Sequence, residues 1–198
     1  MKVLLHTCCG PCASACVPAL RDLGNEVALF FSNSNIDTEA EFEKRLDNAR
    51  KLAAAEGVEL AADAYDHADW LEQVAKGFED EPEKGARCAR CFRYNLARTA
   101  AYAAAHGYDA FTTSLTVSPH KVSQMVFEAG ADAAWWTGRG RPAYVARAPS
   151  PLQSSAPEFL PVDFKKKDGF LRSLRRAAEL GLYRQSYCGC EFSRRNVV

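Results

Sequence analysis

The chain has 198 residues, its 25 Lys and Arg are balanced by 25 Asp and Glu, and 47% of its positions are apolar. That length favours one domain that buries its own core, and the composition excludes a disordered or low-complexity chain. No apolar run approaches the roughly 20 residues of a membrane span, and residues 1–5 lead into a strand-like run without the pattern of a signal peptide. We therefore expect one cytoplasmic domain, 1–198, whose thiols stay reduced.

Strand-like and helix-like segments alternate in the first part of the chain. Residues 2–6 and 26–31 are short apolar runs typical of buried strands. The residues between them, 11–23, can form a helix that ends at Gly24. Two strands joined by a helix of this length are typical of a parallel sheet.

Two longer helices are predicted next. Thr38 and Glu41 form a capping box, and apolar residues recur at helical spacing from there until Gly57. The same spacing predicts a helix from about 91 to 106, with Gly107 after it.

The remaining segments continue the alternation. An apolar strand is expected near 110–117, and Ser118 followed by Pro119 has the pattern of a helix start. The proline-rich stretch 135–161 is predicted to be irregular, and a last helix covers about 169–180. The sequence therefore predicts an α/β fold with a parallel sheet flanked by helices.

Three distinctive segments each follow a predicted strand. They are residues 7–12, 32–36 and 114–121. Ligands in open α/β sheets bind beyond the carboxyl ends of the strands, so we expect these segments to share one rim.

The balanced net charge conceals a basic C-terminal segment. Residues 161–198 contain nine Lys and Arg against four Asp and Glu, whereas the first 160 residues contain 16 against 21. We interpret the segment as a local contact for a polyanion, and a solvated helix face is the alternative. Residues 161–198 are expected to form a basic helix and a metal-binding tail within the same domain.

The eight cysteines are grouped along the chain. They form a C-C-x-x-C run, a C-x-x-C pair, a C-x-C pair and one single residue: Cys8, Cys9 and Cys12; Cys88 and Cys91; Cys188 and Cys190; and Cys16. Closely spaced cysteines let both sulfurs face one metal centre, and a second pair can complete its coordination. The two pairs therefore make a four-thiolate set suited to a structural zinc or to an iron–sulfur cluster.

The three N-terminal cysteines follow the first strand, where this fold class binds ligands. Cys8, Cys9 and Cys12 therefore indicate a second metal or a redox group. The C-G-P-C run from Cys9 to Cys12 also has thioredoxin-type spacing, so a thiol–disulfide oxidoreductase is an alternative. Cys16 stands among small helix residues and is expected in the core.

Other residues indicate contact with nucleic acid. No P-loop or dinucleotide-binding glycine motif is present. Residues 184–187 (Arg-Gln-Ser-Tyr) can read phosphates, base edges and stacked bases, and residues 164–167 (Phe-Lys-Lys-Lys) can contact phosphates. A zinc-stabilised RNA-binding module is therefore a second alternative. His6 and His120 are candidate ligands or proton donors, with a structural role as their alternative.

Taken in order, these segments resemble the QueH-type epoxyqueuosine reductases over almost the whole chain. The matching segments are His6–Cys12, Asn33–Ile36, Glu41–Phe42 with Arg45, Arg87–Phe92, Ser114–Leu115, Ser118–Lys121, Asp163–Lys166 and Tyr183–Cys190. The C-G-C ending is the most specific element. Ser34 stands where the family often has proline, the family does not require Cys16, and residues 135–157 align least.

The resemblance implies a HUP-like (PP-loop-like) fold and the last step of queuosine biosynthesis. Epoxyqueuosine at the wobble position of a tRNA anticodon is reduced by two electrons to queuosine, with loss of water. The implied cofactors are a [4Fe–4S] cluster and an adjacent mononuclear iron. The implied partners are tRNA bearing epoxyqueuosine and an electron donor of the reduced ferredoxin or flavodoxin type, with no membrane.

The resemblance also implies roles for residues of this sequence. Cluster ligands would be Cys88, Cys91, Cys188 and Cys190. The second iron would be held by Cys8 and Cys9, completed by Cys12 or a nearby carboxylate. The catalytic set would be Cys8, Cys9, Asp163, His120 and Tyr187, with His6 as a further proton-donor candidate. Substrate would be bound by Asn33, Asn35, Arg45, Ser118, Lys121, Lys165, Arg184 and Gln185.

Overall fold

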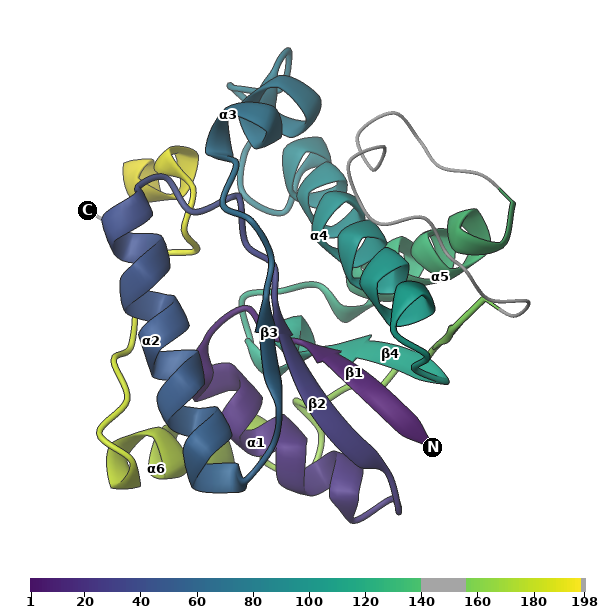
Figure 1. Ribbon diagram of the computed structural model, residues 1–198. Helices are drawn as coiled ribbons and strands as arrows, with labels where there is room; N and C mark the ends of the chain where they lie inside the picture. The colour runs from purple at the N-terminus through teal and green to yellow at the C-terminus, as the bar shows by residue number, and fades with distance from the viewer. Residues whose placement is uncertain (140–155, 197–198) are drawn as a thin grey trace.

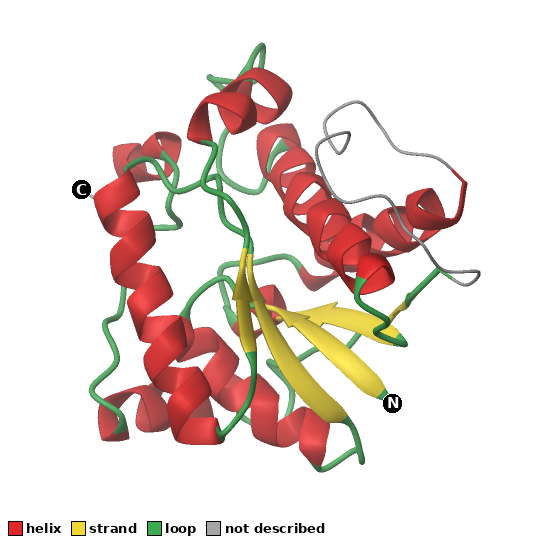
Figure 2. Ribbon diagram, in the orientation of Figure 1, coloured by secondary structure: helices red, strands yellow, loops and turns green. Residues whose placement is uncertain are grey.

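The computed structural model describes residues 1–139 and 156–196. Its centre is a sheet of five parallel strands in the order β3-β2-β1-β4-β5 (Figures 1 and 2). The strands are β1 (Lys2–His6), β2 (Glu26–Phe31), β3 (Leu60–Ala62), β4 (Ala110–Thr113) and β5 (Glu158–Phe159). Because β1 lies between β2 and β4, its carboxyl end opens at the middle of one edge of the sheet.

Helices cover both faces of the sheet, which confirms the predicted fold class. They are α1 (Gly10–Arg21), α2 (Glu39–Glu56), α3 (His67–Trp70), α4 (Ala86–Ala105), α5 (Ser123–Arg139) and α6 (Gly169–Glu179), with the short helical turns η1 (Leu71–Ala75), η2 (Ser114–Val117) and η4 (Glu191–Asn196). On one face lie α4 and α5, and on the other lie α1, α2 and α6 (Figure 1). Across the described residues, no helix combines the length and apolar character needed to cross a membrane.

The central strand shows how the sequence specifies these layers. Successive side chains of a strand point to opposite faces, so Leu4 packs in the core under α4 and α5, while Val3 and Leu5 pack under α1 and α6. All three are fully buried. Burial on both faces explains why the strand is a continuous apolar run rather than an alternating one.

The predicted capping signals of α2 are confirmed at both ends. The Thr38 hydroxyl accepts the backbone N–H of Glu41 at 3.3 Å, and Gly57 ends the helix in the left-handed conformation with φ of 60°. The Glu41 carboxylate does not complete the capping box. It accepts hydrogen bonds from Arg45 and Tyr183 instead, and therefore belongs to the site described below.

The predicted helix start at Ser118 and Pro119 is wrong. Ser118 follows η2, and its carbonyl accepts the backbone N–H of Lys121 in a turn. Its hydroxyl accepts the backbone N–H of His120 at 3.2 Å. Because this turn uses the local hydrogen-bonding groups, α5 begins only at Ser123.

Several other segments differ from the prediction. The irregular stretch predicted over 135–161 is helical up to Arg139 and contains β5, while its residues 140–155 lie outside the described part. The strand predicted over 110–117 ends at Thr113 and continues as η2. Helix α4 starts at Ala86, earlier than predicted, and β3 was not predicted. Strands of two or three residues are too short to show a periodicity.

A buried ion pair joins the sheet edge to α4. Arg98 donates from Nε and Nη2 to the two carboxylate oxygens of Asp63 at 2.5 and 2.8 Å, and Ser32 donates to the same carboxylate at 2.7 Å. The side chains of the pair are 9% and 17% exposed. Removing one partner of such a pair leaves a charge that is poorly solvated.

We therefore predict that Arg98→Met lowers the free energy of unfolding by about 3–5 kcal/mol. The control is Arg93→Met on the same helix, whose pair with Asp132 has side chains 35% and 42% exposed. That change is expected to cost about 1 kcal/mol or less. Urea unfolding of both variants measures the difference, and equal losses would contradict the assigned role of burial.

Candidate metal centre and substrate cavity

A cavity of about 420 Å³ opens beyond the carboxyl ends of the strands. Its wall contains residues from the three segments predicted to share a rim, among them Cys8, Asn33 and Lys121. The start of α4 and the C-terminal tail complete the wall through Cys88 and Cys188. The cavity therefore brings together segments from both ends of the chain, from Cys8 to Ser193.

The first group of thiols stands where β1 leads into α1. The sulfurs of Cys8, Cys9 and Cys12 all lie within 4.8 Å of one another, and those of Cys8 and Cys9 are 4.0 Å apart. The Cys9 sulfur caps α1 by accepting the backbone N–H of Cys12 at 3.4 Å. Within the part of the chain that the structure describes, this is the one group of three ligands close enough to hold a single metal ion.

The three thiols differ in how readily they lose a proton. Hydrogen bonds from the thiols of Cys12 and Cys8 lower the pKa of Cys9. The bonds that Cys12 gives to Cys8 and Cys9, together with burial, raise the pKa of Cys12. The group therefore carries one thiolate readily, and the charge of a bound cation would favour loss of the other protons.

The second group of thiols joins the start of α4 to the C-terminal tail. Burial raises the pKa of Cys91, and negative charge on Cys188, Cys190 and Cys88 raises it further, because these thiols face it. All four are free thiols. The two predicted cysteine pairs therefore meet in space.

The spacing of this second group suits a cluster better than a single ion. Four sulfurs bound to one zinc at about 2.3 Å lie about 3.8 Å apart by tetrahedral geometry. No three of the sulfurs of Cys88, Cys91, Cys188 and Cys190, all of which the structure describes, lie within 4.8 Å of one another. A wider arrangement fits a cluster in which each cysteine binds a different iron atom.

Hydrogen-bond donors surround the same sulfurs. The backbone N–H of Lys84 points to the Cys88 sulfur at 3.4 Å, and the Asn95 amide to that of Cys91 at 3.8 Å. The ammonium of Lys121 lies 2.7 Å from the Cys188 sulfur. Such donors stabilise thiolates and modulate the potential of iron–sulfur clusters, so the surroundings also fit that group.

Gly189 lets the tail approach the loop after β2. Its φ is +140°, and a Cβ there would lie 3.1 Å from Asn35 Nδ2 and 3.2 Å from Arg45 Nη1. The Gly189 carbonyl accepts the backbone N–H of Asp37 at 3.0 Å, and Arg45 Nη1 donates to the Cys188 carbonyl at 2.9 Å. The tail is therefore held through its backbone, at the residue between the two thiols.

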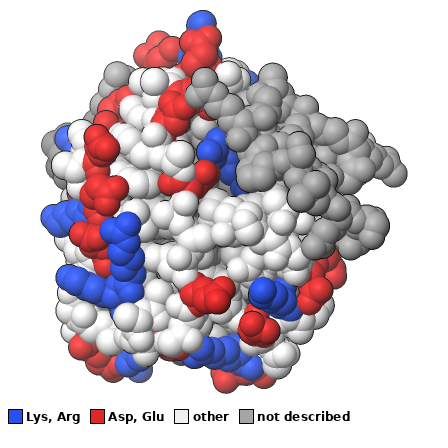
Figure 3. Space-filling view, viewed as in Figure 1, with Lys and Arg blue, Asp and Glu red and all other residues white. Residues whose placement is uncertain are grey.

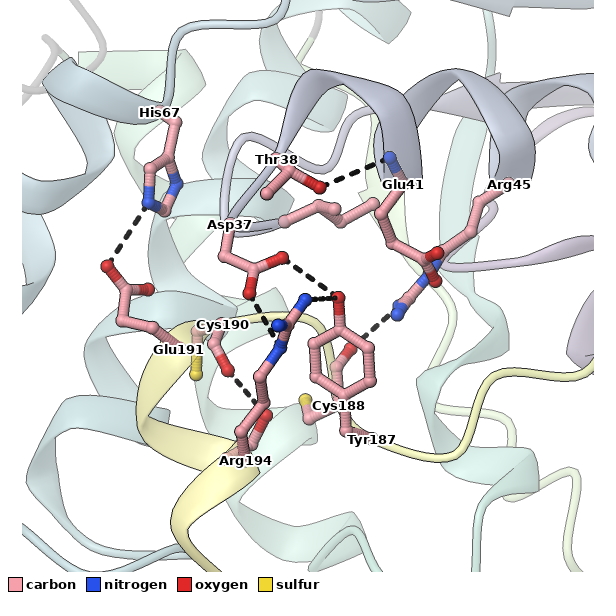
Figure 4. A network of polar contacts seen from close by, with 12 residues as sticks. Asp37, Thr38, Glu41, Arg45, His67, Tyr187, Cys188, Cys190, Glu191 and Arg194 are labelled. Carbon is pink, nitrogen blue, oxygen red and sulfur yellow. Dashed lines mark hydrogen bonds and ion pairs between the residues drawn. The ribbon is translucent and has the colours of Figure 1, made fainter.

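We call these backbone contacts of Cys188 and Gly189 the anchor of the tail. Side chains on either side of Gly189 add to it (Figure 4). Asp37 accepts a hydrogen bond from the Tyr187 hydroxyl at 2.8 Å and pairs with Arg194 at 2.9 Å, and Arg194 donates to the same hydroxyl at 2.9 Å (Figure 4). Beyond Cys190, the carboxylate of Glu191 lies 3.3 Å from the His67 ring (Figure 4). These contacts fix the direction in which the tail thiols point.

Arg45 links this anchor to the cavity. Its side chain is only 2% exposed, and its Nε donates to Glu41 at 2.7 Å. Its Nη2 is buried without a hydrogen-bond partner among the described residues, although Arg45 lines the cavity. Asn95 also lines the cavity, and its Oδ1 is unpaired in the same way. Unpaired buried groups are costly, so both are candidate contacts for a bound molecule.

Most of the predicted site residues line the cavity. They are Cys8, Cys9, Cys12, Cys88, Cys91, Cys188, Asn33, Asn35, Arg45, Ser118, His120, Lys121, Arg184, Gln185 and Tyr187. Cys190, Asp163 and Lys165 do not line it. Cys190 is buried behind Cys91, and Asp163 accepts the backbone N–H of Lys165 at 3.2 Å.

Two contributors to the site were missed by sequence reasoning. Asn95 lies four residues after Cys91, so it occupies the same face of α4 one turn later, and that spacing is a usable signal. Asp37 anchors the tail across 150 residues of sequence, and no local pattern reveals such a contact.

His6 is placed in the core as a neutral side chain. Its Nε2 donates to the Ser32 carbonyl at 3.1 Å, and its Nδ1 accepts from the Thr113 hydroxyl at 2.8 Å. Burial lowers the pKa of His6 to about 4. Cys16 is also fully buried, in the core between α1 and the sheet. His6 therefore has the structural role given as its alternative, and Cys16 lies in the core as predicted.

Charge is mixed on the face shown in Figure 3, and the C-terminal segment carries several exposed basic side chains. On the face shown in Figure 3, acidic and basic side chains are interspersed over α2, where Arg50 pairs with Asp47. In contrast, four basic side chains of the C-terminal segment are exposed and have no ion-pair partner among the described residues: Lys166, Lys167, Arg172 and Arg175. Helix α6 begins at the cavity, since Phe170 and Ser173 line it.

We predict that Arg45→Met loosens the tail while the fold persists. The lost hydrogen bond from a charged group is worth about 1.5–3 kcal/mol, so amide exchange in residues 187–190 should accelerate by about 10–100-fold. Arg50→Met changes an exposed arginine of the same helix and should leave that exchange unchanged. Hydrogen-exchange mass spectrometry measures both variants, and equal effects would contradict the anchor.

The chain is similar to known proteins over nearly its whole length. Residues 3–196 match the family model described as Epoxyqueuosine reductase QueH. The chain is 32% identical to the Epoxyqueuosine reductase QueH of Streptococcus pyogenes serotype M1, over 97% of this chain and 70% of that protein. It is 33% identical to the protein of the same name from Dehalococcoides mccartyi, over 97% of this chain and 92% of that protein.

A solved structure with the same fold is the U34-tRNA thiolase NcsA from Methanococcus maripaludis with its [4Fe-4S] cluster. The two superpose with a TM-score of 0.53 at 16% identity, over 98% of this chain and 61% of that chain, so this likeness concerns the fold. The family model covers nearly the whole chain, including every cysteine of both thiol groups. The chain therefore belongs to the QueH family of epoxyqueuosine reductases.

Proposed function

We propose that this chain reduces epoxyqueuosine to queuosine at the wobble position of tRNA, the last step of queuosine biosynthesis. The observation that carries the proposal is the meeting of two thiol groups at one cavity, in a chain of the QueH family. A cavity of about 420 Å³ is large enough to enclose a modified nucleobase.

The proposal assigns the two thiol groups to two metal centres. Cys88, Cys91, Cys188 and Cys190 would hold a [4Fe–4S] cluster, and Cys8, Cys9 and Cys12 would hold a mononuclear iron. The close spacing of the first group, Cys8, Cys9 and Cys12, and the wider spacing of the second group support this division. The thiolase that shares this fold is described with a [4Fe-4S] cluster, so the fold accommodates one.

The overall reaction balances with two electrons and two protons. The epoxide loses both of its carbon–oxygen bonds, a carbon–carbon double bond forms, and the oxygen leaves as water. When bound, the iron centres would supply single electrons and polarise the epoxide oxygen. The electrons would come from a one-electron carrier protein of the reduced ferredoxin or flavodoxin type.

The residues of the chain would bind the substrate and deliver protons. Arg45 Nη2 and Asn95 Oδ1 offer one unpaired donor and one unpaired acceptor to the edge of the modified base. His120 is exposed at the cavity, and the proposal assigns it the role of proton donor. The Tyr187 hydroxyl already donates to Asp37, and Asp163 does not line the cavity, which makes both weaker candidates.

Phosphates of the tRNA would meet the exposed basic side chains next to the cavity. Arg184 is exposed at the cavity wall, and the unpaired basic residues of the C-terminal segment continue from there along α6. Asn33, Asn35, Ser118 and Gln185 line the cavity and complete the proposed substrate contacts. The proposal thus assigns the predicted polyanion contact to the surface of the C-terminal segment.

The test is turnover of epoxyqueuosine-containing tRNA by anaerobically reconstituted protein with a chemical reductant. Cys190→Ala removes a proposed cluster ligand and should abolish both the cluster absorbance and turnover. Cys16→Ala removes a cysteine outside both groups and should keep both. Full turnover by a Cys190→Ala protein without a cluster would overturn the assignment.

A glycine substitution tests whether the anchor positions the tail thiols. Gly189→Ala introduces a Cβ within 3.1–3.3 Å of Asn35, Arg45 and Ile36, so cluster iron per chain should fall to below about half of the wild-type value. Gly181→Ala also lies in the tail and also has a positive φ, but its Cβ meets nothing within 4 Å. The Gly181 variant should keep its iron, and equal losses would contradict the anchor.

A further inference from the structure

Lys121 is a half-buried cation whose ammonium faces a sulfur rather than a carboxylate. Its Nζ lies 2.7 Å from the Cys188 sulfur, and no acidic side chain among the described residues forms an ion pair with it. The side chain is half-buried and lines the cavity, and a lysine side chain is ordinarily an ammonium ion at neutral pH.

The backbone and the ring below it hold this ammonium in place. The Lys121 backbone N–H closes the turn with the Ser118 carbonyl at 3.2 Å, and the Lys121 carbonyl accepts the Lys165 ammonium at 2.8 Å. The ammonium also lies over the Phe92 ring, 5.5 Å from its centre, one residue after Cys91. Hydrogen bonds thus hold both the backbone N–H and the carbonyl of Lys121, and its ammonium points to the second thiol group at Cys188.

This geometry differs from the phosphate contact expected from the sequence. A lysine that binds a phosphate of the substrate is normally exposed and mobile before the substrate arrives. The ammonium of Lys121 already has a hydrogen-bond partner in the protein itself, the sulfur of Cys188. The exposed basic residues of the C-terminal segment remain free for phosphates instead.

We propose that Lys121 sets the reduction potential of the iron–sulfur cluster by holding its ammonium against the sulfur of Cys188. The inference rests on the proposed cluster and deepens it. One-electron reduction adds one unit of negative charge to a cluster, and a nearby fixed cation stabilises that reduced form. Lys121 therefore raises the potential, and the cluster accepts an electron from a weaker donor than it otherwise would. Lys121 is a positioning residue for electron transfer and does not contact the reacting atoms.

The test is a redox titration of the full chain, reconstituted anaerobically and monitored by EPR. Lys121→Met removes the charge at similar volume and should lower the ratio of reduced to oxidised cluster at least tenfold at a fixed potential. That change corresponds to a shift of the midpoint by about 59 mV to more negative values for a one-electron couple. Lys121→Arg keeps the charge and should stay within about threefold of the wild type.

Lys84→Met is the matched control. Lys84 lines the same cavity, but its ammonium is exposed and only its backbone N–H points to a sulfur, so the substitution keeps that contact. Its midpoint should stay close to the wild-type value because water screens the lost charge. An unchanged potential in Lys121→Met, or an equal shift in Lys84→Met, would overturn the proposal.

Iron and sulfide analysis separates this proposal from the proposed function. Wild-type protein that takes up no cluster would overturn the cluster itself and the inference with it. If the wild type binds a cluster but neither Lys121→Met nor Lys121→Gln does, Lys121 serves assembly rather than potential, and the inference alone fails. If Lys121→Met does not fold, Lys121→Gln is titrated in its place, with the same shift expected.

Discussion

The site depends on the way in which the C-terminal tail is fixed to the loop after β2. Arg45 and Asp37 bind backbone atoms of Cys188 and Gly189, so they fix the main chain between the two tail thiols. Arg45 is itself buried and paired with Glu41 on the same helix. Two thiols of the second group are thus positioned from α2 and the other two from α4, and the sheet between these helices sets the separation of the pairs.

The fold determines where the site lies, and the thiols determine which metal groups the site can bind. A parallel sheet leaves a rim at the carboxyl ends of its strands, and many unrelated proteins use that rim for ligands. Here the turn after β1 carries three cysteines, and the first of them is held by Ser114 from the turn after β4 through the backbone N–H of Cys8 at 3.0 Å.

Local patterns predicted the parts of the fold that local interactions determine. The capping threonine at Thr38, the left-handed Gly57 and the buried run of β1 each depend on residues within a few positions. The cysteine spacing predicted the N-terminal thiol group and the four-thiolate set of the two distant pairs, and the family resemblance implied which metal group each would hold. The anchor at Asp37 was not predictable, because its partners are 150 or more residues away. The start of α5 was misplaced because a turn at Ser118 used the groups of an apparent helix cap.

We propose above all that the chain holds an iron–sulfur cluster beside a second iron. The most direct measurement is iron, zinc and acid-labile sulfide per chain in anaerobically purified protein, together with its visible spectrum. The account predicts about four or five iron atoms and about four sulfides per chain, with the broad absorbance of a cluster. One zinc and no sulfide, even after anaerobic reconstitution, would contradict it and leave a structural metal site.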